Sequence, residues 1–429
     1  MRTRPFASAC YAGGRERQLL LECLESGRWS SFRAGMQGLD VRQVGTLTSA
    51  AAALYGPLDL RFLGGRYVRE LEARFSEHVG VPYAVAANSA TSALVMALGA
   101  LNLGPGDEVL VPSMSFHATA TAVLASNSVP VFVEVKEDTF CLDPEDAAAK
   151  VTARTRALIA VHLGGNTADM EALQELARRH SLKVIEDCAQ APGVTYKGRQ
   201  VGGLGDAGVF SLTETKNITC GEGGVLVTSD PAVAFKARLI RNHGEGVADA
   251  QWPDADLVNV VGMNFRLTEL QAAVAVAQLE TLEERNRLRQ ENADYLIAAL
   301  RHRPELVPPH REAGAGYVCY ILKFLYEPRP GGPDRDTLAA ALVAEGIPIV
   351  AGYPRLMYEN PVFSRRIAYG AGGCPFTPPY HDGALRYGTG SCPRSEAINR
   401  RFLWFPFVHP PNRRDDMDDV VRAFDKLLG

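Results

Sequence analysis

Lys216 and Asp187 are the two residues of this chain whose types and positions most suggest chemistry. Each comes directly after a short apolar run in a sequence that alternates strand-like and helix-like segments, so both side chains are expected at the same edge of one parallel sheet. A lysine that can form a Schiff base, facing a carboxylate that can keep a pyridine nitrogen protonated, is what pyridoxal phosphate chemistry requires. Because lysine and aspartate are common near strand ends, the neighbouring motifs have to support this interpretation.

A phosphate site is suggested by residues 87–92, which connect an apolar run at residues 83–86 to an apolar, helix-like segment that starts at Ala93. Small residues at the start of a helix leave backbone N–H groups free to approach a phosphate, and the helix dipole adds attraction. Thr91 and Ser92 also offer hydroxyl donors. The alternative is an ordinary serine or threonine helix cap without a ligand.

An aromatic residue and a glycine-rich turn accompany this segment. Phe116 follows the strand-like run 109–112 and could stack on a pyridine ring, although an aromatic residue at such a position is more often part of a core. The segment Gly221-Glu222-Gly223-Gly224 follows Lys216 and predicts a turn ahead of a strand at residues 225–228.

These motifs in this order resemble the DegT/StrS family of fold-type I aminotransferases, which depend on pyridoxal phosphate and act on keto sugars and keto cyclitols. The resemblance extends from about residue 64 to residue 300 and more loosely to the C-terminus. It rests on Ala90-Thr91, Pro112-x3-Phe116, Glu186-Asp187-x-Ala189-Gln190, Ser211-x4-Lys216-Asn217 and Gly223-Gly224.

The resemblance implies a role for each candidate residue. Lys216 would bind the cofactor covalently and then carry a proton as base and acid, while Asp187 would keep the pyridine nitrogen protonated. Phe116 would fix the ring plane, and Gln190 would hydrogen-bond the cofactor. The phosphate would be held by Ala90, Thr91, Ser211 and, across a dimer interface, Asn264. From its own sequence context Asn264 could equally be a turn residue. No metal site is expected.

The expected fold class is α/β. Apolar runs that alternate with helical periodicity predict a mostly parallel sheet covered by helices on both faces, and the resembled fold has seven strands and a smaller C-terminal α+β domain. The predicted divisions are an N-terminal segment with an insertion at residues 1–63, a large cofactor-binding domain at 64–300 and a small domain at 301–429. A capping box at Thr268 predicts one long helix towards Leu300.

Two segments fall outside this pattern. Family members usually need only a few residues where this chain has 30–63, which include a helix candidate at 48–55 and could cover the active site or extend a subunit interface. Residues 370–393 are rich in Gly, Pro, Tyr and Cys and predict an irregular loop.

Composition limits the classes of partner. A net charge of −4 gives no electrostatic signature for nucleic acid or an anionic membrane. The sequence has no apolar run long enough to span a bilayer and no signal-peptide pattern. The eight cysteines are scattered without a CxxC pair, which favours reduced thiols and a cytoplasmic location.

Some residues depart from the family pattern or have two interpretations. Ala191 and Pro192 stand where a small residue and a histidine often follow the aspartate motif, and Tyr358 stands where a histidine is frequent. These changes could alter the substrate pocket. His117 and His162 lie beside expected strand ends and are interpreted as structural or supporting residues rather than catalysts.

The predicted function is that of an aminotransferase that converts a keto sugar or keto cyclitol, with glutamate or glutamine as amino donor, in a homodimer with shared active sites. A related sugar dehydratase is disfavoured because those relatives replace the lysine that Lys216 represents. A non-catalytic regulator of the same fold is disfavoured by the intact Lys216 and Asp187.

A keto cyclitol or simple keto sugar is predicted ahead of a nucleotide-linked sugar. A nucleotide diphosphate would need several cationic or backbone donors near the pocket mouth, and the motif loops contain no basic cluster. The arginines that folding could assemble there are Arg28, Arg33, Arg61, Arg66 and Arg355.

Overall fold

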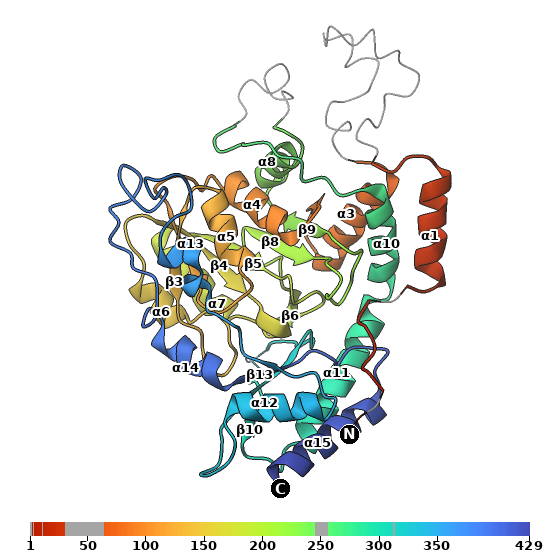
Figure 1. Cartoon of the computed structure of the whole chain (residues 1–429). Coiled ribbons are helices and arrows are strands. Elements are labelled where there is room, and N and C mark those ends of the chain that lie inside the picture. Colours follow the sequence, from red (N-terminus) through yellow and green to blue (C-terminus); the bar gives the residue numbers. More distant parts are fainter. Residues whose placement is uncertain (1, 3, 11, 31–63, 245–255, 312–313) are drawn as a thin grey trace.

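A central seven-stranded sheet and a smaller four-stranded sheet organise the molecule (Figure 1). The computed structural model describes residues 2, 4–10, 12–30, 64–244, 256–311 and 314–429. The helix candidate at residues 48–55 lies outside the described residues. Within the described part, no helix is both long and apolar enough to cross a membrane.

The large sheet confirms the predicted mostly parallel architecture. Its strands are β1 (Tyr83–Ala87), β2 (Glu108–Pro112), β3 (Val129–Val133), β4 (Thr155–Val161), β5 (Lys183–Asp187), β8 (Ala207–Ser211) and β9 (Gly224–Thr228). They lie in the order β1-β9-β8-β5-β4-β2-β3. Strand β9 is antiparallel to both its neighbours, and all other pairs are parallel.

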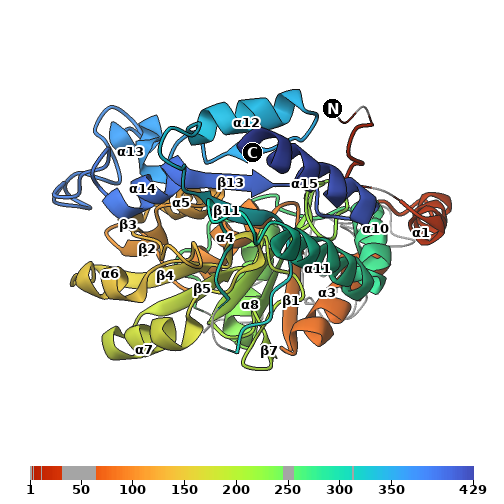
Figure 2. The same cartoon turned by 90° about the horizontal axis from the view of Figure 1, so that it is seen from below.

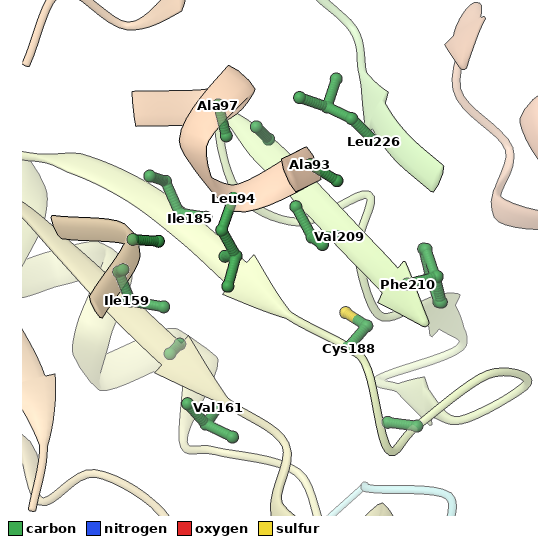
Figure 3. Packing of buried hydrophobic residues seen from close by; sticks show 14 of the residues in the cluster. Ala93, Leu94, Ala97, Ile159, Val161, Ile185, Cys188, Val209, Phe210 and Leu226 are labelled. Carbon is green, nitrogen blue, oxygen red and sulfur yellow. The ribbon is translucent and has the colours of Figure 1, made fainter. Parts of the chain in front are cut away.

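The apolar sequences of these strands explain why the sheet is buried. Every residue of β2, β3, β8 and β9 is buried, as expected for strands covered by helices. Helix α4 (Ala90–Ala100) packs on β8 and β9, with Leu94 in the same apolar cluster as Ile185 and Val209 (Figure 3). Helix α7 (Met170–His180) packs on β4 and β5.

The smaller sheet is antiparallel and belongs to the C-terminal part of the chain (Figure 2). Its strands are β10 (Leu306–Val307), β11 (Leu322–Tyr326), β13 (Phe402–Phe405) and β12 (Val350–Ala351), in that order. Helices α12 (Arg335–Ala344) and α15 (Arg414–Leu428) pack with it around a second apolar core that contains Phe324, Phe405 and Phe424.

The predicted helix from Thr268 to Leu300 is divided in the structure. The capping box at Thr268 is present and opens α10 (Glu269–Glu280), and α11 (Leu282–Ala299) follows after Thr281. The Thr281 hydroxyl donates to the Gln278 carbonyl at 3.2 Å and accepts from Arg285 at 2.9 Å. A threonine that bonds to its own backbone in this way competes with regular helix hydrogen bonds, which accounts for the interruption.

The remaining helices, strands and turns pack around the two sheets. They are α1 (Gly14–Glu25), α3 (Arg66–Val79), α5 (Ala118–Ala125), α6 (Pro144–Ala149), α8 (Pro231–Arg241), α13 (Pro361–Ser364), α14 (Pro393–Arg401), the hairpin β6 (Thr195–Tyr196) and β7 (Arg199–Gln200), and the 3-10 turns Leu163–Gly165 and Met357–Glu359. Residues 370–393 contain no regular helix or strand before Pro393, where α14 begins.

The division at residues 300 and 301 stays a prediction. The second apolar core already includes Ala293 of α11, and the C-terminal residues Tyr358 and Phe376 belong to the core of the large sheet. Near the N-terminus, Phe6 stacks on Phe407 at 4.3 Å, while α1 packs on α10. The described N-terminal residues therefore contact both the part built on the large sheet and the part built on the smaller sheet.

Candidate active site

A cavity of about 400 Å³ lies where β1, β4, β5 and β8 end. Ligands of open α/β sheets bind outside the carboxyl ends of the strands, so this is the expected place for a site. All but one of the predicted cofactor residues line it, namely Ala90, Thr91, Phe116, Asp187, Gln190, Ser211 and Lys216. The exception is Asn264.

The start of α4 forms one end of the cavity. Ser89 is the N-cap, and its hydroxyl accepts from the Ser92 N–H at 3.1 Å. The N–H groups of the first helical residues, Ala90 and Thr91, have no partner within the helix and are available to an anion. Strand β9 approaches so closely that a Cβ on Gly224 would lie 2.5 Å from the Ala90 nitrogen. Gly224, the second glycine of the predicted pair, is therefore needed for this close packing.

Asp187 ends β5 and is 5% exposed. Its carboxylate accepts from the Thr119 hydroxyl at 2.9 Å and from the Ala189 N–H at 3.1 Å, which orient it into the cavity wall. Burial raises the pKa of Asp187, while these hydrogen bonds and the nearby Lys216 act in the opposite direction. Among the described residues it makes no ion pair, so a protonated ring nitrogen would supply the cation that this carboxylate lacks.

Lys216 enters the cavity from the loop between β8 and β9. Its amine donates to the hydroxyl of Tyr320 at 3.2 Å and lies 4.3 Å from the centre of that ring. Ser211, the last residue of β8, accepts from the Thr213 N–H at 3.4 Å, at the beginning of the same loop. The end of β8 and the loop after it thus bring a hydroxyl and an amine to the same cavity.

Gln190 is oriented by the turn Leu163–Gly165. Its side-chain oxygen accepts from the Gly164 N–H at 2.7 Å, which leaves the NH2 group as the side that can donate. Gly164 has φ +64°, and a Cβ there would lie 2.7 Å from the amine of Lys323. The buried Lys323 donates to the Leu163 carbonyl, and burial lowers its pKa to about 8.

Ser89, Ala90, Thr91, Asp187, Gln190, Ser211 and Lys216 together are called the cofactor wall below. The opposite side is the aromatic wall, formed by Tyr320, Tyr353 and Trp404. Tyr353 and Trp404 meet edge to face at 4.5 Å, and the Tyr353 hydroxyl and the Trp404 indole nitrogen are buried without a hydrogen-bond partner among the described residues. Burial raises the pKa of Tyr353, and the Gln190 side chain acts in the opposite direction.

The aromatic wall and Thr119 were missed by the sequence analysis. Tyr320 and Trp404 flank or lie in strands of the smaller sheet, far along the chain from the motifs. The one sequence signal near this wall was Tyr358, five residues after Tyr353, which stands where a histidine is frequent. Phe116 was found, and at 64% exposure it lies open at the cavity rather than in the core.

Asn264 is exposed and lies outside the cavity. Its carbonyl accepts from the Asn88 side chain at 3.4 Å, and the next residue, Phe265, accepts from the Asn88 N–H at 2.8 Å. Asn264 is therefore beside the segment that leads to Ser89, on its outer side. A phosphate contact from Asn264 to the site of another subunit stays a prediction.

His162, Glu186 and Cys188 form a buried cluster behind the cofactor wall, and one potential ligand atom from each lies within 4.8 Å of the others. Glu186 already accepts from His162 at 3.1 Å and from the N–H groups of Gly202, Leu204 and Gly205. The other ring nitrogen of His162 accepts from the Ala168 N–H at 3.1 Å. The cluster is thus a hydrogen-bonded support for the end of β5.

The departures from the family pattern do not line the cavity. Tyr358 is fully buried, donates to Glu396 at 2.7 Å and packs edge to face on Phe132. Ala191 and Pro192 are buried behind the wall. Of the arginines considered for a nucleotide, Arg28, Arg66 and Arg355 are absent from the lining, while Arg33 and Arg61 lie outside the described residues.

Comparisons with known proteins agree with this geometry. Residues 59–386 match the model of the DegT/DnrJ/EryC1/StrS aminotransferase family. An L-glutamine:2-deoxy-scyllo-inosose aminotransferase of Streptomyces lividus is 38% identical over 84% of this chain and 85% of its own. GDP-perosamine synthase of Caulobacter vibrioides is 44% identical over 51% of this chain and 58% of its own. The crystal structure of an aminotransferase from Psychrobacter cryohalolentis covers 99% of both chains with a TM-score of 0.81 and 28% identity.

The chain belongs to the DegT/DnrJ/EryC1/StrS family and has the fold of a fold-type I enzyme. It is a pyridoxal-phosphate-dependent aminotransferase that acts on sugars or cyclitols. The cavity fits that cofactor, because it combines a lysine amine, a buried carboxylate without a cation and a helix start that the absence of a Cβ at Gly224 leaves open.

Proposed function

We propose that this enzyme transfers the amino group of glutamine to the carbonyl carbon of a keto cyclitol in the biosynthesis of an aminocyclitol of the antibiotic type. Relatives that align over most of the chain carry this activity in their names, including an L-glutamine:scyllo-inosose aminotransferase of Streptomyces griseus, 34% identical over 97% of the chain. The observation that carries the proposal is the chemistry of the aromatic wall.

The lining of the cavity favours an uncharged, hydroxylated ring. Lys216 is the one cationic side chain among the described lining residues, whereas a nucleotide diphosphate needs several strong donors. Tyr353 and Trp404 have two buried donors without partners among the described residues, and a buried donor left unpaired costs about 1–3 kcal/mol. Ring hydroxyls of a cyclitol are acceptors that would remove this cost.

The cofactor, when bound, supplies an aldehyde that takes up the amino group and a ring that accepts electron density. Asp187 would hold the ring nitrogen, and Gln190 and Phe116 would fix the ring plane. The start of α4 with Ser211 would hold the phosphate. With the cofactor held in this way, the amine of Lys216 would be the basic group available for the proton that has to move.

Lys216 has two tasks in this arrangement. It would hold the cofactor, and its amine, when free, would take up and give back the proton that transamination moves between two carbon atoms. The same amine would serve in the half reaction with the ketone. A single residue can do both because the two half reactions use the same site in sequence.

Single-turnover measurements test the substrate. The purified enzyme is loaded with amino groups from glutamine, separated from the donor and mixed with individual ketones, and return of its visible absorption reports transfer. Rapid return with 2-deoxy-scyllo-inosose or scyllo-inosose is expected. Return with nucleotide-linked ketones alone would overturn the proposal.

A nucleotide-linked keto sugar is the second candidate. It is favoured by the GDP-perosamine synthase relative, which is 44% identical over 220 residues. This identity is higher than that of the inosose aminotransferases, although the aligned stretch is shorter. The same panel of ketones decides between the two candidates, because each predicts return of absorption with a different ketone.

A further inference from the structure

Tyr320 connects the amine of Lys216 to the molecular surface. The amine donates to the Tyr320 oxygen at 3.2 Å, and that oxygen lies 3.1 Å from the hydroxyl of Thr215. Tyr320 is 8% exposed, whereas Thr215 is exposed. The three polar groups therefore form a continuous hydrogen-bonded chain from the amine to Thr215, an exposed residue that also lines the cavity.

The backbone holds Tyr320 in this position. Its N–H donates to the Gly164 carbonyl at 3.2 Å, and its carbonyl accepts from Arg289 at 3.4 Å. Gly164 is also the residue that orients Gln190. The hydroxyl of Tyr320 is thus fixed relative to the cofactor wall, as a group with a positioning role must be.

The direction of the hydrogen bonds suits proton transfer. Because the amine donates to the Tyr320 oxygen, the hydrogen of the Tyr320 hydroxyl remains available for Thr215. The hydroxyl of Thr215 can in turn donate to water. Every member of the chain then has a donor on one side and an acceptor on the other.

We propose that Tyr320 and Thr215 form a proton relay that exchanges the proton carried by Lys216 with solvent. This inference rests on the proposed role of Lys216 as the proton carrier. In the outward step, the amine gives a proton to the Tyr320 oxygen, Tyr320 gives its hydroxyl proton to Thr215, and Thr215 gives its own to water. One proton leaves the amine, one enters water, and both hydroxyls end neutral. The inward step is the reverse.

A tether without proton transfer is the alternative. In that case Tyr320 would only hold the amine in place, through the hydroxyl or through the ring that lies 4.3 Å away. Tyr320→Phe keeps the ring and removes the hydroxyl. Thr215→Val keeps Tyr320 intact and interrupts the chain at its outer link, so it separates the relay from the tether.

Isotope exchange in the holoenzyme tests the relay. Enzyme, glutamine and the ketone accepted in the single-turnover assay are mixed in D2O, and replacement of the donor's α hydrogen by deuterium is measured by proton NMR against transamination in the same sample. The ratio of exchange to turnover should fall about fivefold or more in Tyr320→Phe, a factor that corresponds to the loss of one net hydrogen bond. It should fall in Thr215→Val and stay at the wild-type value in Thr215→Ser.

The matched control is Tyr326→Phe. Tyr326 is buried in the neighbouring strand β11, and its hydroxyl donates to the Pro333 carbonyl at 3.0 Å, outside the cavity lining. Its exchange ratio should equal that of the wild type. An unchanged ratio in both Tyr320→Phe and Thr215→Val would overturn the relay, and a fall in Tyr320→Phe alone would reduce Tyr320 to a tether.

Two further measurements separate this inference from the assignment of Lys216. Exchange of the α hydrogen that persists in Lys216→Ala would refute Lys216 as the proton carrier, independently of Tyr320. In the protein freed of cofactor, acetylation of Lys216 by acetic anhydride, followed by peptide mass spectrometry, should become faster in Tyr320→Phe because the amine loses its acceptor. An equal rate would show that Tyr320 does not hold the amine.

Discussion

The cofactor wall and the aromatic wall differ in how completely their polar groups are paired. In the cofactor wall, Asp187 and Gln190 each accept hydrogen bonds from neighbouring residues, and Glu186 accepts four behind them. In the aromatic wall, the donors of Tyr353 and Trp404 have no partner among the described residues. The first wall is organised by hydrogen bonds within the fold, while the second contains two donors that the described residues leave unpaired.

The walls also differ in their support. Parallel strands and the start of α4 carry the cofactor wall, so one sheet fixes its members relative to each other. The aromatic wall is clamped locally: the Asn399 side chain accepts from the Tyr353 N–H at 2.8 Å and donates to the Tyr353 carbonyl at 2.9 Å. This difference suggests that the reaction type resides in the first wall and substrate choice in the second.

Removal of Lys216 should have the largest effect. Lys216→Ala is expected to lower kcat by more than about 10³-fold, since general acid–base transfer alone contributes up to about 10⁴-fold. Borohydride should fix cofactor onto the wild type at Lys216 and not onto the variant, as measured by peptide mass spectrometry. Lys197→Ala, at a surface lysine paired with Glu171, is the control. Near-normal transamination by Lys216→Ala would show that the cofactor wall has been assigned wrongly.

Asn264 tests whether the cofactor wall needs a second subunit. Asn264→Ala should raise the dissociation constant of the cofactor about tenfold, as expected for loss of a hydrogen bond to a charged phosphate. Mixed with Lys216→Ala, it should regain activity, because one site of the hybrid dimer would carry both wild-type residues. A fully active monomer, measured by sedimentation at assay concentration, would contradict this prediction.

The aromatic wall should affect the ketone and spare the donor. Tyr353→Phe and Trp404→Phe are each expected to raise the KM for the ketone about three- to tenfold, the effect of one neutral hydrogen bond. The half reaction with glutamine should stay close to wild type. A ketone that lacks the hydroxyl bound by the replaced side chain should have a higher KM than the full substrate in the wild type, and this difference should disappear in the variant. Equal discrimination by wild type and both variants would remove the aromatic wall from substrate recognition.

The smallest effect on turnover is expected for Lys323, which lies behind the turn between the two walls and bears on stability instead. Burial lowers its pKa from 10.5 to about 8, so between these pH values the unfolded chain binds more protons than the folded one. The free energy of unfolding should therefore rise by roughly 3 kcal/mol from pH 8 to pH 10.5 through this group. Below about pH 8, the full loss of stability that results from the lowered pKa of Lys323 is present. Denaturant titrations of wild type and Lys323→Met should give a difference curve with this rise, and a flat curve would contradict it.

The cofactor wall could be predicted from sequence because each member follows an apolar strand. The runs at residues 83–86, 157–161 and 208–210 all became strands of the large sheet, and parallel strands bring their ends to one edge. Apolar runs that are recognisable in the sequence therefore sufficed to place these residues at one edge of the sheet. The same holds for the capping box at Thr268, which needs only four neighbouring residues.

The aromatic wall could not be predicted in this way. Tyr320, Tyr353 and Trp404 come together only because β13 pairs with both β11 and β12 and this sheet meets the cavity, and no spacing in the sequence encodes that contact. The break at Thr281 was missed for a related reason. Residues 269–299 contain no glycine or proline to mark it, while the competing side-chain hydrogen bonds become visible only in the folded chain.

The turn Leu163–Gly165 has a thermodynamic consequence. It accepts from Lys323 and Tyr320 on one side and donates to Gln190 on the other, so its position is shared by the two walls. Any ligand that shifts this turn when it binds one wall must change affinity at the other wall. Thermodynamic linkage requires the two changes in affinity to be equal. A ketone analogue that makes the cofactor bind more tightly must therefore itself bind more tightly, by the same factor, when the cofactor is present.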